Sequence, residues 1–160
     1  MNDFSLRACR YRDLDQVLAV EKASFPDRPY TKLEFSSFLL LAGEGFMVAR
    51  LGDSVVGYVI AMKSGGAGLI ASIAVSPELR MKGIGEALMT AALRHLTKFD
   101  QVYLQVDANN EIAISLYRKL SFRETGKRIR GYYPNGDDAI EMARDEAVSD
   151  SRTTGHNSKE

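Results

Sequence analysis

The pattern of apolar and polar residues shows two periods along the chain. Some stretches have the two-residue period of strands, and others have the period of about 3.6 residues that is typical of helices. Short alternating or β-branched runs predict strands, at 4–9, 46–51, 54–62, 69–75, 101–106, 122–131 and 138–143. Longer segments with apolar residues three or four positions apart predict helices, at 14–23, 32–41, 83–99 and 110–120. This order predicts one mixed α/β sheet domain.

Capping and turn residues mark where several of these elements begin and end. Asp13 is expected to cap the first helix, and Thr31 followed by Glu34 fits a capping box at the start of the second. The glycines within 43–45 are expected to end that second helix. The Gly-Asp pair at 52–53, between two strand-like runs, predicts a β-hairpin.

The overall charge gives no reason to expect a nucleic-acid partner. The chain has 160 residues, with 21 Lys plus Arg and 21 Asp plus Glu, so any anion must be bound by a local site. The single cysteine, Cys9, excludes an intramolecular disulfide and a cysteine-based metal cluster, and it is interpreted as a small core residue. No metal site is expected.

The two ends of the sequence predict neither a secretion signal nor a membrane segment. Residues 1–10 lack the apolar stretch of a signal peptide, and no apolar run approaches the ~20 residues of a membrane span. A soluble cytoplasmic protein without a membrane partner is therefore expected. Residues 144–160 contain no aromatic residue, which predicts a disordered tail after a folded domain at 1–143.

The segment RMKGIG has the composition of an anion-binding loop. Gly83 and Gly85 let a ligand approach the backbone N–H groups at the start of a helix, and Arg80 and Lys82 add positive charge. No Gly-Lys-Ser/Thr string of a P-loop is present, and Leu88 stands where a dinucleotide fingerprint needs a small residue. Taken alone, a Gly-x-Gly after a strand can equally be a simple turn whose charges are solvated.

Two motifs together resemble those of the GCN5-related N-acetyltransferase (GNAT) family. Arg-x-x-Gly-x-Gly follows SIAVSPE, and the later segment LQVDANNEIAISLYRKLSFRETG places Asn110, Ala113, Leu116, Tyr117 and Phe122 at the family's spacing. The resemblance covers nearly the whole domain. It implies the GNAT fold, in which a mixed and mostly antiparallel sheet of about seven strands carries four helices and its central strands splay apart to hold acetyl-CoA.

The resemblance also implies roles for individual residues. Backbone groups of 73–75 would face the pantetheine arm and the thioester of acetyl-CoA, residues 80–86 would hold the pyrophosphate, and Asn110 would contact the cofactor arm. Tyr117 is implied as the proton donor to the leaving thiolate. The residues implied in cofactor binding are Ile73, Ala74, Val75, Arg80, Met81, Lys82, Gly83, Ile84, Gly85, Glu86, Asn110 and Tyr117.

Within the family, the chain is most similar to N-terminal α-amine acetyltransferases of the ribosomal-protein alanine acetyltransferase (RimI-like) type and their archaeal Ard-type relatives. KASFPDRPYT and RGYYPNGDDAIEMA carry this narrower match. It implies that a peptide N-terminus is bound by Phe25, Pro26, Tyr30, Gln105, Tyr132 and Tyr133. The alternative is that these aromatic residues only belong to the core or its rim, although loops carry function more often than packing.

The general base of the family is missing from its usual positions. Gln105 stands where Glu or His is common, and Leu69 stands where His, Tyr or Glu is common. Gln can hold a water molecule but cannot take up a proton. Glu34 is a candidate catalytic base, with helix capping as the alternative, and the tyrosines of the two loops could relay a proton through water.

The missing base affects the possible substrates unequally. A peptide α-amine with a pKa near 8 is roughly one-tenth neutral at pH 7, whereas a lysine with a pKa near 10.4 is neutral about once in 2,500 molecules. Deprotonation at pH 7 therefore costs about 1.4 kcal/mol for the α-amine and about 4.6 kcal/mol for lysine. This favours protein or peptide N-termini as acceptors.

Three hypotheses follow from the sequence. The first is an acetyl-CoA-dependent N-terminal acetyltransferase, and the second is a lysine or small-molecule amine acetyltransferase of the same fold. The third is a CoA-binding module with weak catalysis. The preferred N-terminal residues and the oligomeric state stay open at this point.

Overall fold

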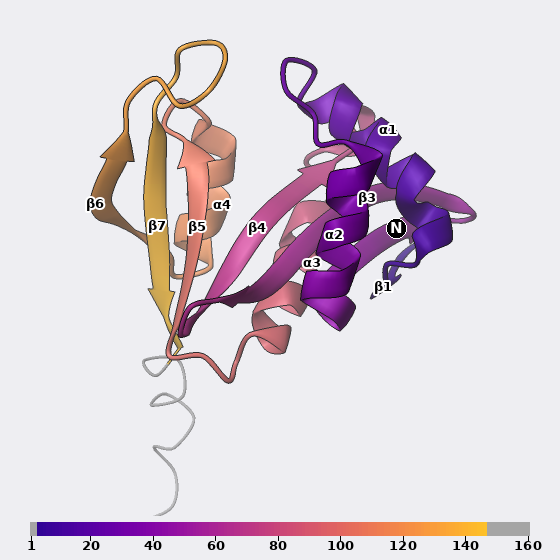
Figure 1. Cartoon of the computed structure of the whole chain (residues 1–160), viewed down its shortest axis with the longest axis horizontal. Coiled ribbons are helices and arrows are strands. Elements are labelled where there is room, and N and C mark those ends of the chain that lie inside the picture. The colour runs from indigo at the N-terminus through magenta and orange to yellow at the C-terminus, as the bar shows by residue number, and fades with distance from the viewer. Residues whose placement is uncertain (1–2, 147–160) are drawn as a thin grey trace, which may run out of the picture.

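The computed structural model describes residues 3–146, which form one seven-stranded sheet with helices on both faces (Figure 1). The strands are β1 (Phe4–Ala8), β2 (Phe46–Leu51), β3 (Ser54–Ser64), β4 (Ala67–Val75), β5 (Gln101–Asp107), β6 (Arg123–Ile129) and β7 (Ala139–Asp145). The helices are α1 (Leu14–Ser24), α2 (Lys32–Ala42), α3 (Ile84–His95) and α4 (Glu111–Lys119), with short 3-10 turns at Tyr11–Asp13, Gly43–Gly45 and Pro77–Leu79. The predicted mixed α/β fold is confirmed.

The sheet is antiparallel throughout except at its centre. Its order is β1-β2-β3-β4-β5-β7-β6, and only β4 and β5 run parallel. These two strands pair at three positions, from Gly68 with Val102 to Ile70 with Leu104. Beyond that point they diverge, and Figure 1 shows the β5–β7–β6 half of the sheet leaning away from the β1–β4 half. The predicted splay of the central strands is therefore present.

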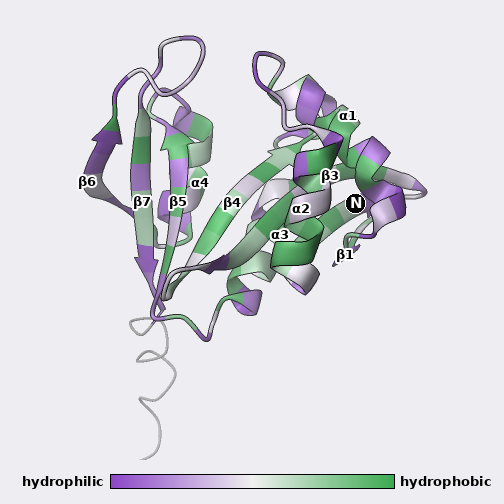
Figure 2. Ribbon diagram, viewed as in Figure 1, coloured by the Kyte–Doolittle hydropathy of each residue, from purple (hydrophilic) through white to green (hydrophobic). Residues whose placement is uncertain are grey.

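Apolar side chains form a core on each face of the sheet. The core under α3 and α4 continues across both halves of the sheet, and its members include Val59, Leu88, Met89, Val102, Leu104, Tyr117, Ile140 and Met142. The core under α1 and α2 covers only the β1–β4 half, and its members include Leu14, Val17, Phe35, Phe46, Tyr58 and Ile60. β5 and β7 are therefore covered by a core on one face only. Figure 2 shows the corresponding alternation of polar and apolar residues along these two strands.

Several local predictions are confirmed. Thr31 caps α2, since its Oγ1 accepts a hydrogen bond of 3.2 Å from the Glu34 N–H. Gly43 ends the same helix with φ +54, a conformation that glycine adopts without steric cost. β2 and β3 form the expected hairpin around residues 52–53.

One capping prediction is wrong. Asp13 precedes α1, but its side chain does not cap that helix, because it is already held from the other side. Both carboxylate oxygens accept hydrogen bonds from Arg7, at 2.7 and 2.8 Å, and one of them also accepts from the Arg10 N–H. These donors hold the pKa of Asp13 below its usual value, the Arg7 hydrogen bond first among them.

The last strand ends two residues later than the predicted strand at 138–143. β7 continues to Asp145, where the Arg123 guanidinium donates a hydrogen bond of 2.6 Å to the carboxylate. The predicted tail beyond 146 lies outside the described residues, so its disorder stays a prediction. Across residues 3–146, none of the helices combines the length and the apolar character needed to cross a membrane.

Candidate active site

The sheet opens at a defined point, which places two walls of different chemistry opposite one another. On β4, Ala71 is a bulge residue without a partner on β3, and Ser72 follows it. On β5, Gln105 is the first residue beyond the β4 ladder, and it lies directly across from Glu141 of β7. We call Glu21, Tyr58 and Ser72 the closed wall, because α1 and α2 cover it, and Tyr103, Gln105 and Glu141 the open wall.

The predicted anion-binding loop, residues 80–86, leads from the end of β4 into α3. Gly83 precedes the first turn of α3 with φ +85, which a residue with a side chain rarely adopts. The first α3 hydrogen bond runs from the Ala87 N–H to the Gly83 carbonyl, so the preceding N–H groups have no partner within the helix. Arg80 donates from Nε to the Val75 carbonyl at 3.3 Å, which ties the loop to β4.

Gly85 is not required by the packing of the protein itself. A Cβ built there would lie 3.8 Å from Leu116 and Val75, which is ordinary van der Waals contact. Its backbone also needs no left-handed conformation, in contrast to Gly83. A bare backbone at the N-terminus of α3 therefore suits close approach by an external anion. That this anion is a pyrophosphate stays a prediction.

α4 carries the predicted proton donor behind this loop. The Asn110 side chain caps α4 by accepting a hydrogen bond of 3.1 Å from the Ala113 N–H. Tyr117 is 7% exposed and packs edge-on against Phe122, with ring centroids 6.1 Å apart. Burial raises the pKa of Tyr117 to about 12, and Tyr133 adds to that rise. The tyrosine therefore stays protonated through the neutral range.

The two aromatic loops lie at the same end of the opening. Figure 1 shows the α1–α2 loop and the β6–β7 loop facing each other across the two halves of the sheet. Phe25 and Tyr132 are 43% and 48% exposed, so neither ring is buried in the core. Tyr132 and Tyr133 pack edge-on at 5.0 Å, and the pKa of Tyr30 is raised by burial first and also by Glu21 and Tyr132.

Core packing accounts for part of this aromatic group. Tyr30 is half-buried and makes edge-on contacts with Phe35 and Phe38 of α2, at 5.7 and 5.3 Å. Tyr133 is also half-buried, and burial followed by the charge of Asp107 raises its pKa to about 12. In the two loops, the rings of Tyr30 and Tyr133 are therefore half-buried, whereas Phe25, Pro26 and Tyr132 are exposed.

The closed wall contains a buried hydrogen-bond network that the sequence interpretation missed. Glu21 is 2% exposed and accepts a hydrogen bond of 3.1 Å from the Tyr30 N–H and another from the Tyr58 hydroxyl. The Tyr58 Oη lies 2.8 Å from Ser72 Oγ. Burial raises the pKa of Glu21, and the two donors oppose that rise. The network fixes the α1–α2 loop to β3 and β4.

A sequence signal for this network exists. Glu21 lies one helical turn after Val17, on the apolar stripe of α1, where an ionisable side chain must find partners. Its partners, however, come from β3 and from the α1–α2 loop, and only the folded chain brings them together.

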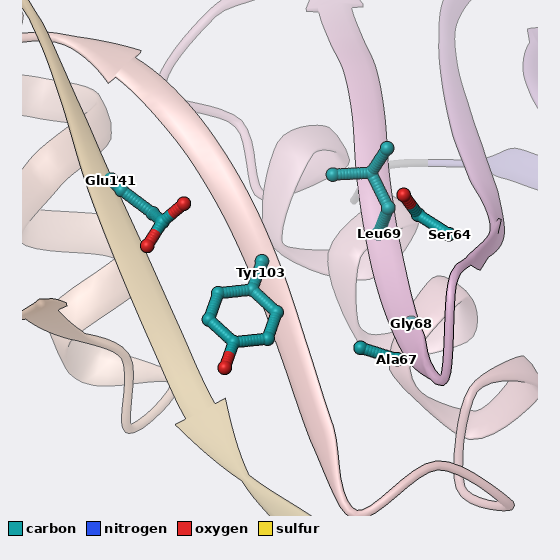
Figure 3. A pocket seen from close by; sticks show the side chains of 6 residues that line it. All are labelled: Ser64, Ala67, Gly68, Leu69, Tyr103 and Glu141. Carbon is teal, nitrogen blue, oxygen red and sulfur yellow. The ribbon is translucent and has the colours of Figure 1, made fainter. Parts of the chain in front are cut away.

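Two residues of the open wall, Tyr103 and Glu141, help to line a cavity of about 410 Å³ at the base of the opening (Figure 3). Its lining residues are Ser64, Ala67, Gly68, Leu69, Tyr103 and Glu141. Figure 3 shows the Leu69, Tyr103 and Glu141 side chains around this space, from three different strands. Glu141 accepts a hydrogen bond of 2.9 Å from the Thr125 hydroxyl, and Lys127 Nζ lies 3.9 Å from its other oxygen. The sequence interpretation did not single out Glu141.

The remaining predicted residues are placed as follows. Gln105 is exposed on the open wall, and Leu69 faces the cavity below it. Glu34 is exposed in the first turn of α2 and accepts a hydrogen bond of 3.3 Å from the Thr31 hydroxyl. Its role as a base stays a prediction, with capping as the alternative. Among residues 3–146, no three His, Cys, Asp or Glu side chains are grouped as metal ligands.

Comparisons with known proteins match the sequence and the fold. The sequence model described as the Acetyltransferase (GNAT) family matches residues 11–122. The chain is 35% identical to the N-alpha-acetyltransferase of Saccharolobus solfataricus, over 89% of this chain and 93% of that protein. Ard1 from Thermoplasma volcanium has a TM-score of 0.82 to this structure at 28% identity, covering 89% of this chain and 97% of the other. Arabidopsis thaliana Naa50, solved with the bisubstrate analogue CoA-Ac-MVNAL, has a TM-score of 0.76 at 29% identity, covering 88% and 97%.

Proposed function

The chain belongs to the GNAT acetyltransferase family, and from this membership we propose that it transfers the acetyl group of acetyl-CoA to the α-amine at the N-terminus of proteins or peptides. The observation that carries the proposal is the opening of the sheet between an anion-binding loop and two aromatic loops. The name of the Saccharolobus relative and the peptide-bearing analogue in the Naa50 structure support the same acceptor.

In this proposal, acetyl-CoA lies along the end of β4. The N–H groups at the start of α3 and the positive charge of Arg80 favour its pyrophosphate, and the bare backbone at Gly85 leaves room for it. Within 73–75, the backbone groups of Ile73 and Val75 would face the strand edge that β5 has left, whereas those of Ala74 point toward β3.

The peptide N-terminus would enter between the two aromatic loops. Phe25, Tyr30 and Tyr132 would surround its first residue, and Tyr133 would lie between that residue and Tyr117. An α-amine needs less help in losing its proton than a lysine does, because its pKa is lower by about 2.4 units. The absence of a base at positions 69 and 105 is therefore compatible with N-terminal acetylation.

Tyr117 would supply the proton to the departing thiolate. Its pKa of about 12 keeps the hydroxyl protonated, so the donor is present at every pH at which the amine reacts. We expect Tyr117→Phe to lower kcat by roughly 10²-fold, in the range usual for a general acid. The wild-type enzyme should also show no fall in rate from Tyr117 ionisation below about pH 11.

The proposed reaction is tested by the release of CoA from acetyl-CoA in the presence of short peptides. A peptide with a free α-amine should support release, and the same peptide with a blocked α-amine should not. Replacing an internal lysine should leave the rate unchanged. Release that follows the lysine, or turnover only with small amines, would show that the acceptor is not a peptide N-terminus.

The cofactor site can be tested separately. Gly85→Ala should raise the Kd for acetyl-CoA by about tenfold, because the added methyl group occupies the approach of the phosphate. The free energy of unfolding should stay the same or rise by up to about 1 kcal/mol, since alanine favours the helix. Calorimetric titration and urea unfolding measure the two effects. Gly66→Ala, at an open position in the β3–β4 turn, serves as the control.

A further inference from the structure

We propose that Glu141 accepts the proton of the substrate amine, through a water molecule held beside Gln105. The inference rests on the proposed function and assigns the base that Gln105 and Leu69 cannot provide. Glu141 lies within the segment RGYYPNGDDAIEMA, but the roles that the resemblance implies there belong to Tyr132 and Tyr133.

The register of the sheet places Glu141 at the point of divergence. Gln105 and Glu141 are directly opposite across the antiparallel β5–β7 pair, so their side chains share one face with Cβ atoms roughly 5 Å apart. Gln105 is also the first β5 residue beyond the last β4 partner, Leu104 with Ile70. Glu141 therefore lies beside the position at which β4 and β5 begin to diverge.

The face is the correct one for meeting the substrate. Ile140 and Met142, the neighbours of Glu141 on β7, are buried in the core beneath α3 and α4. Alternation therefore turns Glu141 away from that core and toward the opening, and Figure 3 shows it with Tyr103 and Leu69 around the cavity. A carboxylate above an apolar leucine can hold a water molecule jointly with the amide of Gln105.

The contacts of Glu141 suit a group that takes up a proton and releases it again. The Thr125 hydroxyl donates a hydrogen bond of 2.9 Å to one oxygen, and Lys127 Nζ lies 3.9 Å from the other. The side chain retains 24% of its exposure, so a proton can pass on to bulk water. The ionisable groups on the two neighbouring strands are Tyr103 and Asp107 on β5 and Arg123, Glu124, Lys127 and Arg128 on β6.

Glu21, a second carboxylate near the opening, is less suited to this task. Glu21 is almost fully buried, and its two oxygens are occupied by the Tyr30 N–H and the Tyr58 hydroxyl. The hydrogen bonds connect it to Ser72 of β4 through the Tyr58 hydroxyl. Glu21 is therefore a positioning residue for the α1–α2 loop.

The proton balance of the step is complete. The amine nitrogen bonds to the thioester carbon, and the nitrogen then loses a proton to the water, which passes one to a Glu141 oxygen. The C–S bond breaks as the sulfur takes the Tyr117 proton. The carboxylic acid and the tyrosinate return to their starting states by exchange with water.

The test compares Glu141→Gln with the wild type on a peptide that has a free α-amine. The variant keeps the shape and the oxygen that accepts from Thr125, but it cannot take up a proton. We expect kcat to fall by about 10²-fold at pH 7, with the KM for acetyl-CoA unchanged. The deficit should shrink above pH 9, where hydroxide replaces the missing base.

Rescue separates a base from a merely structural carboxylate. In the Glu141→Gln background, Gln105→Glu returns a carboxylate to the facing position, and we expect it to restore kcat to within about tenfold of the wild type. Glu124→Gln, on an exposed β6 carboxylate that pairs with Arg118, is the matched control and should leave the rate unchanged.

Wild-type kcat in Glu141→Gln would overturn this inference while leaving the proposed function intact. The same holds for a loss of rate in Ser72→Ala or Glu34→Gln that Glu141→Gln does not share, because that result would place the proton elsewhere. A wild-type protein that acetylates no N-terminal peptide would instead overturn the proposed function, and this inference with it.

Discussion

The closed wall and the open wall lie on either side of the same opening, but their carboxylates differ in burial and in hydrogen-bond partners. On the closed wall, Glu21 is 2% exposed and has buried hydrogen-bond donors for both oxygens. On the open wall, Glu141 keeps 24% of its side-chain exposure and is held by surface groups. The covering helices cause the difference, because α1 and α2 pack on β3 and β4 but not on β5 and β7.

This contrast separates residues that hold the site in shape from residues that are free to react. A buried carboxylate with complete partners stabilises one arrangement and is costly to disturb. An exposed carboxylate contributes little to folding, and so its chemistry is available to a substrate. The contrast predicts that mutations on the two walls divide into effects on stability and effects on turnover.

The largest expected effect on stability comes from Glu21→Ala. The change leaves the Tyr58 hydroxyl and the Tyr30 N–H without their acceptor, and each unsatisfied buried group costs about 1–3 kcal/mol. We expect the free energy of unfolding to fall by roughly 3 kcal/mol in urea titrations. Asp15→Ala removes an exposed carboxylate from the same helix and should cost less than about 1 kcal/mol. Equal losses would erase the distinction between buried and exposed carboxylates.

A pair of tyrosine variants compares the walls with one chemical change. Tyr58→Phe removes a fully buried hydroxyl that links Glu21 to Ser72, and it should cost about 1–2 kcal/mol. Tyr103→Phe removes a hydroxyl that donates to Gln101 at 2.6 Å on the exposed side of the sheet, and it should cost less than about 0.5 kcal/mol. Thermal or urea unfolding of both variants measures the two losses of stability. Equal losses would show that the two hydroxyls contribute equally and would contradict the contrast between the walls.

The pH dependence of stability gives a smaller effect with a defined sign. Burial raises the pKa of Glu21 in the folded chain above the ordinary 4.5. Between pH 4.5 and that raised pKa, the folded state therefore binds more protons than the unfolded state. The wild type should therefore lose stability relative to Glu21→Gln as the pH rises from 4.5 through the raised pKa. Asp13→Asn should give the opposite sign, because the pKa of Asp13 is lowered and its contribution disappears as the pH falls. Unfolding titrations across pH 3–8 distinguish the two.

Glu141→Gln, on the open wall, is also expected to have only a small effect on stability. The side chain keeps its Thr125 partner and loses only a distant contact with Lys127, so the free energy of unfolding should change by less than about 1 kcal/mol. A circular dichroism melt alongside the kinetic assay checks this. A large loss of stability would assign Glu141 to the framework, and the open wall would then resemble the closed one.

The sequence was sufficient for the fold and for locating the loop that we propose as the cofactor site. Strands and helices follow from periodicity, and the loop at Gly83 and Gly85 is contiguous in the chain, so its chemistry can be interpreted locally. The hairpin at 52–53 and the cap at Thr31 are local for the same reason. Asp13 was misjudged because its partner Arg7 lies on a strand, outside the helix whose start it marks.

The acceptor side depends on contacts that no short segment contains. Glu21, Tyr58 and Ser72 come from a helix and two strands, and the bulge at Ala71 sets where Ser72 stands. The position of Glu141 depends on the register of β7 against β5, which the pattern of DAIEMA does not specify. A shift of one residue would have turned the carboxylate into the core.

The short ladder between β4 and β5 has a consequence for hydrogen exchange and assembly. Beyond Ile70 and Leu104, the facing backbone amides of both strands are sheet edges that lie inside the molecule instead of at its rim. Edges of this kind are templates for another extended chain, and here the surrounding helices and loops shield them from edge-to-edge aggregation. Within 71–75 and 105–107, we expect the amides that point into the gap, and not those that pair with β3 or β7, to exchange with deuterium faster than those of β3. Their exchange should slow when an extended ligand lies between the strands.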